Sequence, residues 1–213
     1  MTAERIPSDR RAELKARHRE AILDAADALI RERGKPRFSV DELATRADVA
    51  RRTVFNHFSS LDDVIMTTCT RVLSRAVDEF RAAAAEVPAA RGSRVALFDE
   101  IVSVVRSMDL PTLVAYLWGV LADEGDDGRS QTALEGVFMR TTQQLSIELA
   151  DRSELDEFDV AVLVGSLMNG VAIVARHWML QTGATLDPAS RRLWDELLDR
   201  LIADVRHGYA STD

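Results

Sequence analysis

Residues 49–64 read VARRTVFNHFSSLDDV, and this stretch decides how the rest of the chain is interpreted. Residues four apart share one face of a helix, so Val54 and Phe58 are expected to be buried, with Phe55 at the edge of their face. The cations and hydrogen-bonding groups are expected to be displayed elsewhere on the helix: Arg51, Arg52, Thr53, Asn56 and His57. This pattern predicts a short helix held by one face and offering the other to a phosphate-lined groove.

A second short helix is predicted just before this one. Ser39 begins the sequence SVDE, which matches the Ser-x-x-Glu capping box at the start of a helix. That helix is expected to end near Ala47 and Asp48. Two short helices joined by a tight turn, the second carrying polar groups, form a helix-turn-helix.

The whole chain is predicted to be all-α. It has only 10 Gly and 5 Pro in 213 residues, and no convincing strand periodicity is found. We expect a three-helix head in residues 1–60 and a helical-bundle body in residues 61–213. About nine helices are expected, covering approximately residues 8–33, 39–47, 50–58, 60–87, 93–108, 111–122, 134–149, 157–181 and 188–207.

Composition and charge narrow the functional classes. Residues 1–60 hold 13 basic and 10 acidic side chains, a net charge of +3, within a chain whose net charge is −8. A basic head on an acidic body is the asymmetry expected of a nucleic-acid-binding protein. The single cysteine, Cys69, lies on an apolar stripe and is expected in the core. No catalytic constellation, cofactor motif or metal-binding spacing is found, so an enzyme is not expected.

The N-terminal sequence does not have the pattern of a signal peptide. The most apolar segment, residues 160–175, is short for a membrane span and contains Asn169. A cytoplasmic protein without a membrane partner is therefore expected.

The run SVDELATRADVARRTVFNHFSSLDDVI resembles the DNA-binding domain of TetR-family transcriptional regulators. Proteins of this family are all-helical homodimers whose larger C-terminal body binds a small molecule. The resemblance implies a repressor that binds a palindromic, double-stranded operator and is released by a small, largely apolar effector. Alternatives are an activator or global regulator without such an inducer, or, in a different class, a protein-binding helical adaptor.

The resemblance also assigns roles within the head. Ser39 matches the family's phosphate contact at the start of the second helix, and His57 matches a backbone contact. The exposed recognition positions match Arg51, Arg52, Thr53 and Asn56. Arg52 has a planar fork suited to guanine. The basic residues of the first helix, Arg17 among them, form either a solvated face or an arm that touches DNA.

The chain departs from the family pattern at three positions of the head. Ala50 replaces a frequent serine, so a cap and its phosphate contact are lost. Asp48 stands where the turn usually has glycine, although aspartate tolerates left-handed backbone better than most residues. Leu61 replaces a frequent lysine.

The body is expected to contain an effector pocket between its helices. Candidate lining residues are Phe98, Val102, Tyr116, Trp118, Phe138, Thr141, Thr142, Asn169 and His177. The last two helices are expected to form a dimer interface, because their apolarity exceeds what one face can bury. Candidate interface residues are Gly165, Met168, Ala172, Trp194, Leu198 and Leu201.

Overall fold

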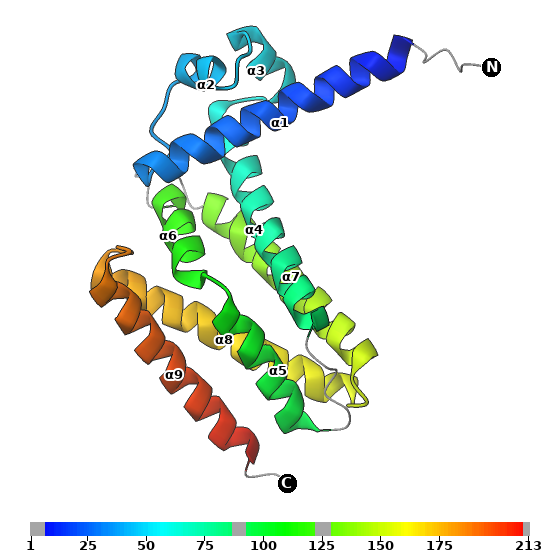
Figure 1. Cartoon of the computed structure of the whole chain (residues 1–213), viewed down its shortest axis with the longest axis vertical. Helices are drawn as coiled ribbons and strands as arrows, with labels where there is room; N and C mark the ends of the chain where they lie inside the picture. Colours follow the sequence, from blue (N-terminus) through cyan, green and yellow to red (C-terminus); the bar gives the residue numbers. More distant parts are fainter. Residues whose placement is uncertain (1–6, 87–92, 122–128, 211–213) are drawn as a thin grey trace, which may run out of the picture. The chain divides into compact units, whose positions relative to one another are not determined.

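The computed structural model describes residues 7–86, 93–121 and 129–210. Within these ranges, side chains are left undescribed at positions 7–9, 121, 129–135, 137, 138, 140, 141, 209 and 210. The described ranges contain nine helices and no strand (Figure 1), as the sequence predicted. The helices are α1 (Pro7–Arg33), α2 (Val40–Arg46), α3 (Arg51–His57), α4 (Leu61–Glu86), α5 (Arg94–Ser107), α6 (Leu110–Leu121), α7 (Arg129–Arg152), α8 (Glu157–Thr182) and α9 (Pro188–Ala210).

The chain divides into two compact units. The first, the head, contains residues 1–72 and 119–125, and the second, the body, contains residues 73–118 and 126–213. Helix α4 contributes to both units, so the division falls within this helix, whereas the sequence placed a boundary before it.

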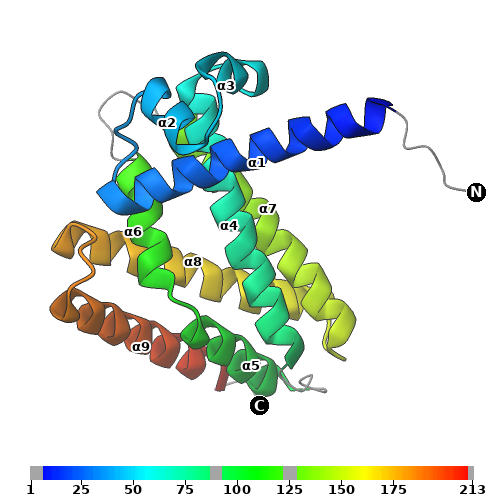
Figure 2. The same ribbon diagram turned by 45° about the horizontal axis from the view of Figure 1, so that its top comes forward.

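The head is built on the packing of α1, α2 and α3 against one another. Its interior is apolar and includes Ile22, Ala26, Leu29, Leu43, Val54, Phe58 and Val64. On α4, Arg71 forms ion pairs with Glu20 (3.0 Å) and Asp24 (2.9 Å) of α1. The first turns of α1 extend beyond α2 and α3 (Figures 1 and 2).

Two turns of the head require left-handed backbone. Gly34 ends α1 with a φ of 66° and donates its N–H to the Ile30 carbonyl oxygen, at 2.8 Å. Asp48, in the turn between α2 and α3, has a φ of 53°. Aspartate adopts this region more readily than most residues other than glycine, which is why it can occupy this turn.

Cys69 is a core residue of α4, as the sequence predicted. Its side chain is fully buried. Burial raises the pKa of the Cys69 thiol to about 12, because the charged thiolate loses its hydration. The thiol is therefore inert at neutral pH.

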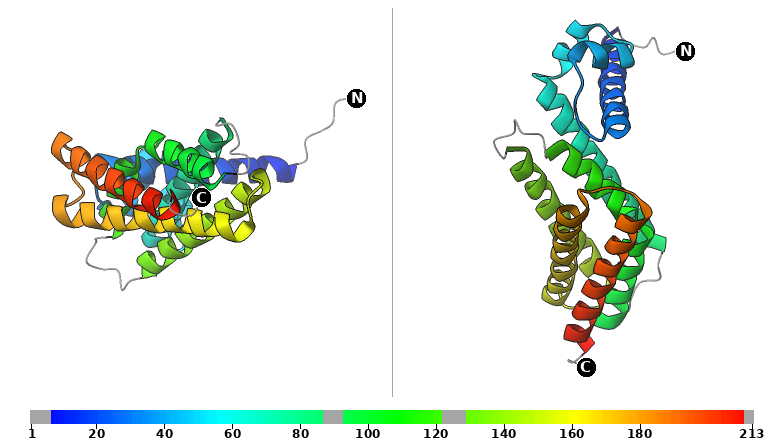
Figure 3. Two further views of the ribbon diagram at one scale, coloured as in Figure 1. Left: turned by 90° about the horizontal axis from the view of Figure 1, so that it is seen from below. Right: turned by 90° about the vertical axis from the view of Figure 1, so that its left-hand side faces the viewer.

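The body has an apolar core made by α5, α8 and α9 together with the ends of α4 and α7. Helices α8 and α9 lie side by side in both views of Figure 3, and Figure 2 shows α5 beside α9. Ion pairs tie α5 to α9: Arg106 bonds Asp199 at 2.7 Å, and Arg206 bonds Asp99.

A second body cluster joins α8 to α9 through two tryptophans. The rings of Trp178 and Trp194 meet edge to face, with their centroids 5.5 Å apart. Trp178 Nε1–H donates to the Ser190 carbonyl oxygen at 2.8 Å, so the buried indole keeps a hydrogen-bond partner. Gly170 lies against Leu201, whose methyl carbon would be 2.3 Å from an added Cβ.

Helix α8 is the one helix in the described ranges that, by itself, is long and apolar enough to cross a membrane. The core helix of a soluble protein meets the same criterion. Its inner face is buried against α7 and α9, including Leu163, Val164 and Trp178. The length and apolarity of α8 are therefore weak evidence for a membrane span.

Replacing Trp178 with phenylalanine is expected to destabilise the body. The change leaves the Ser190 carbonyl without its indole donor, which costs about 1–3 kcal/mol of unfolding free energy. Denaturant unfolding followed by circular dichroism measures the loss. Trp118→Phe is the matched control, because Trp118 is 37% exposed and the same substitution there removes little packing. Equal losses for both variants would contradict the role given to Trp178.

Candidate nucleic-acid interface

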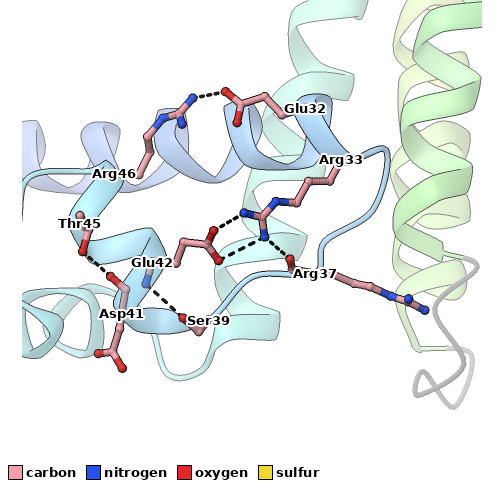
Figure 4. Close-up of polar contacts among 8 residues, drawn as sticks. All are labelled: Glu32, Arg33, Arg37, Ser39, Asp41, Glu42, Thr45 and Arg46. Carbon is pink, nitrogen blue, oxygen red and sulfur yellow. Dashed lines mark hydrogen bonds and ion pairs between the residues drawn. The ribbon is translucent and has the colours of Figure 1, made fainter.

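The start of α2 is fixed by the Ser39 cap. The Ser39 Oγ accepts a hydrogen bond from the Glu42 N–H at 3.2 Å. In a complete capping box the Glu42 carboxylate would accept a hydrogen bond from the Ser39 N–H. Here the Glu42 carboxylate instead pairs with Arg33, as Figure 4 shows. The same guanidinium donates to the Arg37 carbonyl oxygen, so it joins the end of α1 to the approach to α2. The hydrogen bond from Arg33 holds the pKa of Glu42 below its ordinary value.

Helix α3 is anchored by two side chains. Val54 and Phe58 are 1% and 3% exposed, as their spacing predicted. Ala50 caps the helix without a side-chain hydrogen bond, which agrees with the loss of the family's serine at this position. The helix therefore depends on its buried face more than on its cap.

The exposed face of α3 differs from the sequence prediction. Arg51, Arg52 and Asn56 are exposed, as expected, but Thr53 and His57 are half-buried. Phe55, expected at the edge of the anchoring face, is 46% exposed. Positions 51, 52, 55 and 56 follow a helical spacing and make one outward face. A helical-wheel projection with Val54 and Phe58 at the centre of the buried face could therefore have identified Phe55 as exposed.

His57 is half-buried because it faces α1. Its ring lies edge to face with that of His18, with the centroids 6.3 Å apart. Burial lowers the pKa of His57, and the nearby charges of Lys15, His18 and Arg19 lower this pKa further. Arg19 also places its guanidinium 4.5 Å from the centre of the Phe58 ring. The imidazole of His57 therefore lies among basic side chains of α1.

Five arginines of the head are paired with carboxylates of the head itself: Arg31, Arg33, Arg46, Arg51 and Arg71. Arg51 donates to both oxygens of Asp41, at 2.8 and 3.0 Å, and Arg46 pairs with Glu32 (Figure 4). Within the described residues, Arg52 and Arg17 have no such partner. The fold therefore leaves the Arg52 guanidinium free on the outward face of α3.

The start of α4 fixes the end of α3. The Ser60 Oγ accepts a hydrogen bond from the Asp63 N–H at 3.0 Å, so Ser60 caps the start of α4. The Asp63 carboxylate accepts from the Ser59 N–H (2.8 Å) and Oγ–H (3.0 Å), and these bonds lower its pKa. The two helices are consequently joined by a short turn held by hydrogen bonds of Ser59, Ser60 and Asp63.

The predicted effector-pocket residues lie in different environments. Phe98, Val102 and Tyr116 are buried in the body, and Thr142 is half-buried. Trp118 is partly exposed, whereas Asn169 and His177 are on the outer surface of α8 and do not join the buried group. The side chains of Phe138 and Thr141 lie outside the described part of the chain.

The residues predicted for the dimer interface also lie in different environments. Trp194 and Leu198 are 2% and 5% exposed, so the protomer's own core uses them and they are not available to a second chain. Leu201 and Met168 are half-buried against that core. Gly165 and Ala172 lie on the outer side of α8, and nothing lies within 4 Å of a Cβ added at Gly165.

Comparison with known proteins agrees with the geometry of the head. Residues 22–65 match the family model of bacterial regulatory proteins of the tetR family. Uncharacterized HTH-type transcriptional regulators of Mycobacterium bovis and Mycobacterium tuberculosis are each 26% identical over 176 residues, covering 80% of this chain and 86% of theirs.

Solved structures share the fold. A putative TetR-family regulator from Mesorhizobium loti superposes with a TM-score of 0.64 at 16% identity, covering 92% of this chain and 98% of that one. A TetR-family regulator from Streptomyces coelicolor gives 0.60 at 17% identity, covering 89% and 96%. Residues 22–65 thus form the helix-turn-helix, DNA-binding domain of the tetR family of bacterial regulatory proteins, and the chain shares the fold of TetR-family transcriptional regulators.

Proposed function

We propose that this protein is a repressor that binds a palindromic operator as a homodimer and releases it when a small, largely apolar effector binds the body. The observation that carries the DNA-binding part is the outward face of α3, where Arg52 is exposed and forms no ion pair with another residue of the described ranges. A free guanidinium on a helix anchored by its opposite face is suited to contact guanine O6 and N7 in the major groove.

The other head residues take distinct roles in this proposal. Asn56, one turn after Arg52, reads adenine or touches the backbone. Ser39 keeps its own O–H as a donor to a phosphate oxygen, because its cap bond uses only an acceptor lone pair. Arg17 and His57 contact phosphates, which fix the position of the protein without reading sequence. Thr53, half-buried, takes a smaller part than the sequence suggested.

The proposed dimer uses the outer face of α8. Phe158, Val162, Ile173 and Leu180 are 73%, 41%, 62% and 71% exposed and follow one helical stripe. Gly165, Asn169 and Ala172 continue the same stripe. A second copy is the fitting partner, since a twofold axis would bury the stripe against itself. The exposed face of α9 is instead charged, with Asp195, Glu196, Asp199 and Arg200.

Release by a small, largely apolar effector is the most detailed part of the proposal. It rests on the resemblance of the head to TetR-family regulators; of the predicted pocket residues, Phe98, Val102 and Tyr116 are buried in the body. TetR-family regulators are generally non-enzymatic, soluble and cytoplasmic proteins. The experiment below distinguishes this proposal from three alternatives: an activator, a regulator without an inducer and a protein-binding adaptor.

The experiment begins with selection of bound fragments from the source genome. Selected duplexes and scrambled duplexes are then titrated at several salt concentrations. A DNA-binding regulator prefers its selected site and loses affinity steeply as salt rises. A protein-binding adaptor shows neither behaviour. A repressor lowers transcription from the selected promoter, and an effector restores it.

Arg52→Ala is expected to reduce operator affinity selectively. The loss of a bidentate guanine contact costs about 1–3 kcal/mol on the operator and leaves scrambled-duplex affinity nearly unchanged. Fluorescence-anisotropy titration at fixed salt measures both affinities. Arg31→Ala is the matched control, because Arg31 pairs with Asp27 within α1. Equal losses on both duplexes would remove Arg52 from base reading.

His57 is expected to make DNA affinity depend on pH. Its lowered pKa leaves it neutral at pH 7 in the free protein, and a nearby phosphate favours its charged form. Binding therefore takes up a proton, so affinity rises as the pH falls from about 7.5 to about 6. His57→Asn should show a smaller rise on both operator and scrambled duplexes, and His207→Asn, in the body, should behave like the wild type. Identical pH profiles for the wild type and His57→Asn would refute this linkage.

Ile173→Asp is expected to dissociate the dimer. It places a charge on the apolar stripe of α8, where burial without a partner is costly. Light scattering should report twice the chain mass of 23.6 kDa for the wild type and the single-chain mass for the variant. Met139→Asp is the control, since Met139 is 71% exposed but lies on α7. A monomeric wild type at micromolar concentration would end the proposal of a dimer.

A further inference from the structure

Phe55 is an exposed aromatic side chain in the middle of a surface otherwise made of polar groups. It is 46% exposed, whereas the flanking Val54 and Phe58 are 1% and 3% exposed. Its neighbours on the outward face of α3 are Arg51, Arg52 and Asn56. The head's core is therefore closed without Phe55, and the side chain remains available for contacts outside the protomer.

The ring of Phe55 is held in place from one side. The Arg51 guanidinium lies 5.9 Å from the ring centre, within the range of a cation–π contact. Arg51 is itself held by two hydrogen bonds to Asp41 of α2, at 2.8 and 3.0 Å. Asp41, Arg51 and Phe55 thus form a connected row from α2 to the outward face of α3. An aromatic ring supported in this way is pre-organised for contact.

The chemistry of phenylalanine restricts what it can recognise on DNA. Its side chain has no hydrogen-bond donor or acceptor, so it can bind neither a phosphate nor the polar edge of a base. In the major groove, the apolar group displayed by an unmodified base pair is the 5-methyl group of thymine.

We propose that Phe55 is a specificity-determining residue that reads the 5-methyl group of a thymine in the major groove, close to the base contacted by Arg52. This inference rests on the proposed operator binding and adds a second, apolar element to its readout. The contact requires no deformation of the duplex, because the methyl group already projects into the groove. Arg52 would recognise its base by hydrogen bonds, and Phe55 would recognise the thymine methyl group by apolar contact.

The test removes only the methyl groups. The selected operator is prepared with thymidine and with deoxyuridine in every thymine position, and both duplexes are titrated at the same salt concentration. The wild type should bind the deoxyuridine duplex about fourfold more weakly for each methyl contacted, the effect of one buried methylene-sized group. Replacing single thymines then locates the position that is read.

The variants assign this effect to one side chain. Phe55→Ala should bind the two duplexes with nearly equal affinity, while Phe55→Leu keeps an apolar side chain and part of the difference. Leu14→Ala is the matched control, because Leu14 is also an apolar head residue, 44% exposed, but lies on α1. It should keep the full wild-type ratio. Circular dichroism confirms that each variant is folded.

The outcomes separate this inference from the operator proposal. Equal wild-type affinities for the two duplexes, or an undiminished ratio in Phe55→Ala, overturn the role of Phe55 while operator binding stands. A uniform loss of Phe55→Ala affinity for all duplexes, with the ratio kept, shows a non-specific contact and also overturns it. If the wild type does not distinguish any selected duplex from a scrambled one, the proposed operator binding itself fails.

Discussion

The burial of Val54 and Phe58 is the interaction on which the DNA-binding surface depends. Ala50 gives α3 no side-chain cap, and a helix of seven residues is too short to be stable by itself. The two anchors therefore hold the helix against the head and determine which of its side chains face outward. Charge buried at Val54 would disturb every contact on the opposite face, because all of them are positioned by this packing.

The distribution of ion pairs explains how an acidic protein presents a basic surface. Glu32, Asp41 and Glu42 are each paired with an arginine of the head, so the carboxylates nearest α2 do not act as free negative charges. These pairs are exposed and contribute little to stability individually. Their larger effect is on recognition. They neutralise acidic groups near the proposed phosphate path, hold Arg51 beside Phe55 and leave Arg52 unpaired.

In the body, the apolar stripes of α8 and α9 have to be buried. The apolar stripe of α9 packs inside the protomer through Trp194 and Leu198, with Gly170 of α8 allowing a close approach of Leu201. Helix α8 is buried on this side and leaves a second apolar stripe exposed on the other. An exposed apolar face of this length is typical of a partner surface, which is why the proposed dimer is placed there. Intramolecular packing of α9 therefore concentrates the proposed dimer contact on α8.

The sequence by itself determined the helical class, the position of the helix-turn-helix and the capping of α2 and α4, because these depend on local signals: periodicity, serine caps, and turn residues such as Gly34 and Asp48. It predicted the buried Val54 and Phe58 and the exposed Arg51, Arg52 and Asn56, but it did not place Thr53, Phe55 and His57 correctly. A seven-residue helix contains two turns, and the order Thr-Val-Phe-Asn-His-Phe fits more than one apolar face. In the structure His57 lies beside His18 of α1 and is half-buried, whereas Phe55 faces out. The sequence likewise showed broad apolar stripes on α8 and α9, but an apolar stripe is the same whether its partner belongs to its own chain or to another. Only the tertiary structure decided that Trp194 meets Trp178 inside the protomer and that Phe158 and Ile173 remain uncovered, because pairing between distant helices depends on shape as well as on hydrophobicity.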